Sequence, residues 1–135
     1  MKRIPVLLVL VLVASVVAVS PQDSKKRQVA CKTAENAKTC YWTHGRLAAG
    51  NGTPSYRLWK IRTDRVLGIY SGPGAEKIDE LDNEHPELPS SLDKYDLLKT
   101  RIFGDFEVCP LEPEKDGYMQ AACIESAKNT VSEKH

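Results

Sequence analysis

The residues of this 135-residue chain with the clearest chemical role are its four cysteines, which could form disulfides, bind a metal or act as nucleophiles. They are Cys31, Cys40, Cys109 and Cys123. An even set of cysteines in an exported protein favours disulfide bonds, and the N-terminal segment described below indicates export. Neither the spacing of the first pair nor that of the second matches a CxxC redox motif or a zinc motif. We therefore predict two disulfides and no cysteine nucleophile.

A hairpin near the C-terminus predicts how these cysteines pair. Lys115-Asp116-Gly117 is typical of a three-residue hairpin loop, because glycine readily takes the left-handed conformation that such a loop requires. This loop places Cys109 directly opposite Cys123, at a separation that a disulfide can span. We therefore predict a Cys109–Cys123 bridge across the strands, which leaves Cys31–Cys40 as a local second bridge.

The same hairpin gathers carboxylates on its outer face. Glu107 and Glu125 fall opposite each other in this register, and like charges in that position destabilise a strand pair. Either a cation relieves the repulsion or a bulge shifts the register. Together with Asp105, these residues form a candidate site for a hard cation such as calcium. A solvated acidic face, neutralised by lysine side chains (Lys32, Lys38 or Lys128), is the favoured alternative, so no cofactor is predicted.

Aromatic and basic residues in the first half of the mature chain form a second candidate surface. The candidate binding residues are Trp42, His44, Arg57, Trp59 and Tyr70. The alternative for the aromatic residues is burial in the core, which is the commoner fate of such side chains. The histidines do not lie at metal-ligand spacing from one another, so we expect His44 to be a surface or hydrogen-bonded residue.

No motif of an enzyme is present in the sequence. It contains no Gly-x-Ser-x-Gly, HExxH or phosphate-loop pattern, and no nucleophile stands beside a recognisable base. We therefore predict no catalytic residues and no enzymatic activity. A cation-dependent hydrolase that uses the acidic insertion described below is the alternative.

The first twenty residues have the organisation of a secretory signal peptide. A basic start, Lys2-Arg3, precedes an apolar run over residues 4–19 that is short for a membrane-spanning helix. We expect a secreted or periplasmic protein that has no membrane attachment after cleavage. Cleavage removes two of the 19 basic residues and none of the 18 acidic ones, which leaves a net charge of −1. A charge near zero gives no reason to expect nucleic acid as a partner.

The expected domain organisation follows from turn signals and charge runs. It comprises a signal peptide (1–20), a leader with the Cys31–Cys40 loop (21–43), a β domain (44–128) with an insertion (72–100), and a fraying tail (129–135).

Asn51-Gly52-Thr53-Pro54 is a dense turn signal, and Asn51 starts a glycosylation sequon. A two-residue Thr63-Asp64 loop would place Trp59 opposite Gly68, where the indole would cover the glycine.

The insertion is the longest break in the strand pattern. Residues 90–98 predict a short helix, with Ser90 and Asp93 at capping-box spacing and apolar residues on one side. Residues 76–87 are strongly acidic, which would favour a basic partner or a cation. Loops on a rigid scaffold often carry recognition, so the insertion is a candidate protein-binding element. The equal alternative is a solvated linker.

Several turn and core positions resemble those of a known family. Gly45-Arg46-Leu47, Asn51-Gly52-Thr53-Pro54 and Arg57-Leu58-Trp59 resemble the opening of prealbumin-like domains, which include transthyretin-like and carboxypeptidase-regulatory-like modules. Residues 104–108 and Gly117-Tyr118 resemble their closing pattern. The resemblance implies a β-sandwich, and it carries over no hormone-binding or peptidase residue. The chain also resembles uncharacterised secreted bacterial proteins.

Together these patterns predict an all-β protein: a small, disulfide-stapled antiparallel β-sandwich with one long loop or short-helix insertion. A small OB-like barrel is the alternative. One core is expected to contain Leu58, Ile69, Phe106, Val108 and Ile124. We expect a binding or structural module, with a small-molecule carrier that has a cavity between its sheets as an alternative.

Overall fold

A computed structural model describes residues 27–75 and 84–135 of the chain. The expected signal peptide and the acidic residues 76–83 lie outside the described residues. The described part contains five strands and two short 3-10 helices. In chain order these are η1 (Ala37–Thr39), β1 (Tyr41–Ala49), β2 (Tyr56–Lys60), β3 (Val66–Ile69), η2 (Ser90–Leu92), β4 (Thr100–Pro110) and β5 (Gln120–Lys134).

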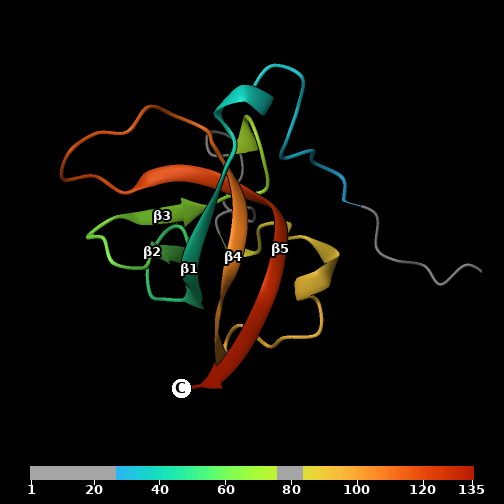
Figure 1. The fold of residues 1–135 in the computed structure, drawn as a ribbon, viewed down its shortest axis with the longest axis vertical. Coiled ribbons are helices and arrows are strands. Elements are labelled where there is room, and N and C mark those ends of the chain that lie inside the picture. The colour runs from blue at the N-terminus through green and yellow to red at the C-terminus, as the bar shows by residue number, and fades with distance from the viewer. Residues whose placement is uncertain (1–26, 76–83) are drawn as a thin grey trace, which may run out of the picture.

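The five strands form one sheet that closes into a barrel, in the order β1-β2-β3-β5-β4 (Figure 1). Neighbouring strands are antiparallel except β3 and β5, which run parallel. The predicted all-β class with disulfide staples is confirmed. The two-sheet sandwich is not confirmed, because the five strands form one sheet and the pairing of β1 with β4 completes its closure. A closed five-stranded barrel corresponds to the OB-like alternative.

The barrel interior is filled by apolar side chains from every strand. All five predicted core residues (Leu58, Ile69, Phe106, Val108 and Ile124) are fully buried in one cluster, which confirms that prediction. The alternating burial along β4 shows why the prediction succeeds: successive side chains of a strand point to opposite faces, so one face of each strand is apolar.

Gly45 allows β1 to pass close to its neighbour where the barrel closes. A Cβ atom at this position would lie 2.7 Å from Cδ1 of Leu58 and 3.1 Å from the carbonyl oxygen of Trp59. A side chain at this position would therefore force the Leu58 side chain or the adjacent backbone of β2 to shift. The long strands β4 and β5 curve around the barrel in Figure 1, and their pairing contains two register irregularities, a common way of bending a strand.

The disulfide pairing differs from the prediction, although the predicted strand register is right at residues 108–110. Cys109 does lie opposite Cys123 in the β4–β5 ladder. However, Cys123 is bonded to Cys31 and Cys109 is bonded to Cys40. The segment before β1 lies over this end of the hairpin and brings both of its cysteines to the pair. The Sγ atoms of Cys31, Cys109 and Cys123 lie within 4.8 Å of one another, so a register argument alone could not choose between partners.

The second hairpin is shifted by two positions from the prediction. Trp59 lies opposite Val66, and Gly68 lies opposite Arg57. Its loop spans residues 61–64, and the Trp59 indole donates a hydrogen bond to the carbonyl of Thr63 within it. A shift by two keeps each side chain on its face, so the core prediction survives. Pro54, not Trp59, covers the glycine: a Cβ on Gly68 would lie 2.8 Å from the proline ring.

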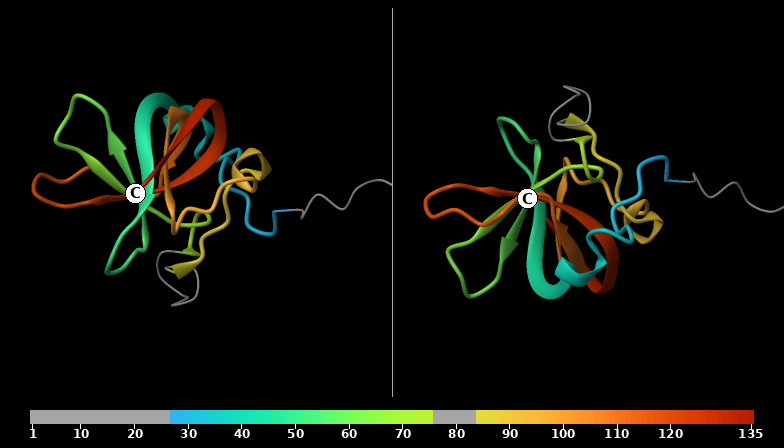
Figure 2. Two further views of the ribbon diagram at one scale, coloured as in Figure 1. Left: turned by 90° about the horizontal axis from the view of Figure 1, so that it is seen from below. Right: turned by 90° about the horizontal axis from the view of Figure 1, so that it is seen from above.

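The described part of the insertion packs against the N-terminal segment and β5. The Glu87 carboxylate accepts hydrogen bonds from the backbone N–H groups of Gln28 and Val29, and the Tyr95 hydroxyl shares one with Thr130 of β5. Figures 1 and 2 place this segment (yellow) beside the blue N-terminal segment, away from the green and orange hairpin loops.

Two local expectations for the C-terminal half differ from the structure. The predicted helix over 90–98 is reduced to η2, whose start has no side-chain cap, and Leu98 is 73% exposed. The expected tail, 129–135, is mostly strand, because β5 continues to Lys134 opposite Thr100 of β4. The β domain therefore includes residues 129–134, whose polar sequence gives no strand signal unless their pairing with β4 is known.

Candidate binding groove

The outer face of strands β1, β2 and β3 forms a groove of about 580 Å³. It is lined by Arg46, Ala48, Ala49, Gly50, Arg57, Trp59 and Val66. These residues meet because of the barrel register: Arg46 lies opposite Trp59 across β1 and β2, and Trp59 lies opposite Val66 across β2 and β3. Side chains at alternate positions of each strand point outward and form one continuous surface.

Trp59 is the fixed aromatic wall of the groove. Its indole N–H donates to the carbonyl oxygen of Thr63 at 2.7 Å, which holds the ring against the hairpin loop. The Arg46 guanidinium lies over the indole, 4.8 Å from the ring centroid. A cation on an indole face is attracted by the electron density of the ring, so this contact stabilises the orientation of the Arg46 side chain and that of the Trp59 side chain. The groove is therefore organised before any ligand arrives.

Arg57 supplies a second guanidinium, held by the loop after β1. Its Nη2 donates to the carbonyl oxygen of Asn51 at 2.7 Å. Like the Nε atom of Arg46, the Nε atom of Arg57 is buried and has no hydrogen-bond partner among the described residues. A buried donor without an acceptor is costly. Because both Nε atoms are covered by the protein, any hydrogen bonds to a ligand would come from the other N–H groups of the two guanidiniums.

The electrostatics of the groove are one-sided. None of the residues that line it is acidic, and among the described residues neither guanidinium takes part in an ion pair. The neighbouring Arg65 shows the contrast, because it forms an ion pair with Glu114. The groove therefore concentrates two uncompensated positive charges on a nearly neutral protein.

The structure brings together only some of the residues suggested as a binding surface. Arg57 and Trp59 line the groove, whereas Trp42 and His44 lie further along β1 and Tyr70 lies outside it. Arg46 was missed by the sequence reasoning. Its signal was its position in the first of two strand-like stretches that are joined by a turn, because Arg46 lies opposite Trp59 once the β1–β2 register is known.

Trp42 and His44 belong to a different part of the outer face, over β4 and β5. Trp42 is 45% exposed, with the Lys128 ammonium 4.2 Å from its ring centroid. Nδ1 of His44 lies 3.0 Å from Oδ1 of Asp105, and Asn129 donates to the other carboxylate oxygen at 2.9 Å. The hydrogen bond from Asn129, followed by that from His44, lowers the pKa of Asp105 below its ordinary value. Asp105 therefore already has hydrogen-bonding partners.

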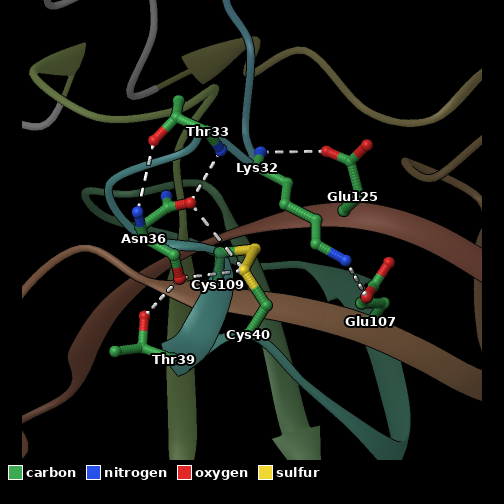
Figure 3. A network of polar contacts seen from close by, with 8 residues as sticks. All are labelled: Lys32, Thr33, Asn36, Thr39, Cys40, Glu107, Cys109 and Glu125. Atoms are coloured by element: carbon green, nitrogen blue, oxygen red, sulfur yellow. Dashed lines mark hydrogen bonds and ion pairs between the residues drawn. A yellow bond between two sulfur atoms is a disulfide. The ribbon is translucent and has the colours of Figure 1, made fainter.

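Two of the three carboxylates of the candidate cation site, those of Glu107 and Glu125, are held by Lys32 (Figure 3). Its ammonium lies 3.0 Å from Oε2 of Glu107, and its backbone N–H donates to Oε2 of Glu125 at 3.0 Å. A register irregularity places Glu107 opposite Ser126, which separates the two glutamates. This arrangement corresponds to the lysine-neutralised alternative. Within the described ranges, the one group with metal-ligand geometry consists of disulfide-bonded cysteines, whose sulfurs are not available as thiolates.

The same close view shows how the N-terminal segment is fastened over the hairpin. Oδ1 of Asn36 accepts a hydrogen bond from the backbone N–H of Thr33, and the carbonyl of Asn36 accepts one from the Thr39 hydroxyl (Figure 3). Together with the Cys40–Cys109 bridge, these contacts close the segment into a compact cap. The network is structural, because its polar atoms are paired with one another.

A second groove, of about 670 Å³, lies beside the insertion. It includes Arg27, whose guanidinium donates to the carbonyls of Val29, Ser71 and Ile124 at 2.6–2.8 Å. This guanidinium joins three segments of the chain and is already supplied with acceptors. The β1–β2–β3 groove differs because its two guanidiniums, those of Arg46 and Arg57, form no ion pair among the described residues.

Within the described ranges, the structure contains no helix of the length and apolarity needed to cross a membrane. The two disulfides indicate an oxidising environment. Comparison with protein-family models finds no match for the chain, and comparisons with curated proteins and with solved structures find none either. The resemblance to prealbumin-like domains therefore stays a prediction.

Proposed function

We propose that this protein is an exported binding module whose ligand-binding surface is the groove on β1, β2 and β3. The observation that carries the proposal is the Arg46–Trp59 stack beside Arg57, all held in place by the protein itself. The export signal in the sequence and the two disulfides support an extracellular or periplasmic site of action.

The size and composition of the groove support small-molecule binding. Its volume of about 580 Å³ falls within the range of ligand sites, which are mostly apolar with a few fixed polar groups. OB-like barrels, furthermore, use the face of their second and third strands for ligands. That analogy concerns the fold alone, whereas Arg46, Arg57 and Trp59 form the groove of this chain.

The other functions considered from the sequence have less support. A carrier with an internal cavity is disfavoured because core side chains such as Phe106 and Leu47 fill the barrel interior, so a small molecule would bind outside it. A cation-dependent hydrolase, and a protein partner bound by the insertion, depend largely on residues 76–83, which lie outside the described residues. Both stay predictions.

The proposal is tested by mapping where small fragments bind to the isotope-labelled mature protein. We expect amide and indole resonances of Arg46, Arg57, Trp59 and Val66 to shift with at least one aromatic fragment, and Trp59→Ala to abolish the effect. Trp42→Ala is the matched control, since it removes an exposed indole elsewhere on β1. Shifts confined to the second groove, or no shifts at any surface, would contradict the proposal.

A further inference from the structure

We infer that the groove binds an amphiphilic organic anion: one carboxylate, sulfonate or phosphate group attached to an apolar, largely planar body. The inference rests on the proposed binding function and names its ligand class. It follows from three features of the groove: its charge, its unused hydrogen-bond donors and the placement of its apolar wall.

The charge of the groove favours an anionic ligand. Arg46 and Arg57 both line it, and no acidic residue does. Guanidinium groups remain protonated at every physiological pH, so two like charges persist in one partly desolvated space. An anionic group placed between them would remove their mutual repulsion and would interact with both.

The unused donors specify what kind of anion fits. A guanidinium carries its N–H groups in one plane, which matches the paired oxygens of a carboxylate, sulfonate or phosphate. Among the described residues, Arg46 interacts with the Trp59 ring and with no hydrogen-bond acceptor, whereas Arg57 uses one N–H for Asn51. Both therefore retain donors for an oxyanion.

The remaining wall of the groove accommodates an apolar body. Ala48 and Ala49 are small, and Val66 and the fixed Trp59 ring border the same space. A flat hydrocarbon or aromatic group could cover these side chains while its anionic group reaches the guanidiniums. The groove thus combines an anion-binding side and an apolar side within one ligand-sized volume.

A nucleic acid fits this surface less well than a small anion. Strands of nucleic acid are held by a long basic track with several aromatic residues on which bases stack. Here the groove contains one aromatic ring and two guanidiniums among small and apolar residues, and the adjacent Arg65 is already paired with Glu114. The charge pattern therefore favours a single anionic group over a polyanion.

Two matched fluorescent probes test the inference. 8-Anilinonaphthalene-1-sulfonate is the anionic probe, and N-phenyl-1-naphthylamine has the same aromatic body without the sulfonate. We expect the sulfonate to bind at least tenfold more tightly, because hydrogen bonds between charged partners are the stronger kind. Arg46→Gln and Arg57→Gln should each weaken sulfonate binding about tenfold and leave the affinity for the neutral probe unchanged.

Arg101→Gln is the control variant, because it removes the same charge from β4, outside the groove, where Arg101 donates to His135. It should leave the affinity for both probes unchanged, and melting temperatures verify that every variant folds. Equal binding of the two probes in the groove would overturn the anion preference and retain the proposed function. If neither probe shifts the resonances of Trp59 and Val66, both the inference and the binding groove are wrong.

Discussion

Removing one disulfide while keeping the other tests the tertiary arrangement most directly. The double variant Cys31→Ala, Cys123→Ala deletes the bridge between the N-terminal segment and β5 without leaving a free thiol. Because Cys40–Cys109 remains, the deleted bridge closes a loop of only about 23 residues, measured through the surviving bridge. The loop-entropy relation then gives a loss of about 3 kcal/mol in unfolding free energy.

A loss of that size is large for a domain of this length. It corresponds to a fall of about 12–20 °C in melting temperature, which calorimetry under non-reducing conditions measures. The variant should contain no free thiol, because Cys40 and Cys109 are bonded to each other. Peptide mapping of the unreduced parent protein provides the second measurement. Recovery of a Cys109–Cys123 peptide, or two titratable thiols in the variant, would refute the observed pairing.

Three further perturbations test the core, the barrel closure and the surface. Phe106→Ala should lower the unfolding free energy by about 3–5 kcal/mol, because the side chain is fully buried, whereas Val131→Ala at a 66% exposed position should change it by less than about 0.5 kcal/mol; similar values in denaturant titrations would contradict the assigned faces. Gly45→Val should destabilise the barrel by at least about 1–3 kcal/mol, since a Cβ already meets Leu58 at 2.7 Å, and an unchanged melting temperature would be incompatible with the close approach. Asn129→Ala should raise the pKa of Asp105 toward its ordinary value, which carboxyl NMR titration measures. Because the folded-state pKa of Asp105 is depressed, the ionised carboxylate stabilises the fold at neutral pH, and this stabilisation is lost as the pH falls below about 4. An unchanged titration curve would show that Asn129 is not the main cause of the depressed pKa.

Features that depend on neighbours in the sequence could be predicted from it. The turn at residues 115–118 has Gly117 at a φ of +78°, as the glycine signal indicates. Cys109 lies opposite Cys123 as predicted, although β4 and β5 are joined by residues 111–119 and not by a three-residue loop. Burial of Phe106 and Val108 follows from alternation along one strand, whose period of two is local. Even the wrong register of the second hairpin preserved the buried faces, because it was wrong by an even number of positions.

Features that depend on distant segments were decided only by the tertiary structure. Closure of the barrel requires β1 to pair with β4 and β3 to lie parallel to β5, and neither pairing has a connecting turn that would reveal it. The final residues of β5 appeared to be a polar tail because their partner, the start of β4, is about thirty residues away in sequence. Local polarity could not indicate a strand whose stability comes from that partner.

The disulfides and the groove share this origin. Each bridge joins residues 69 or 92 positions apart, so the choice of partner depends on where the N-terminal segment lies over the hairpin. Arg46 likewise acquires its place beside Trp59 only when β1 and β2 pair. Residue types and alternation determined which side chains face outward. The barrel determined which of them meet, because contact between distant residues is a property of the closed sheet and not of any one strand.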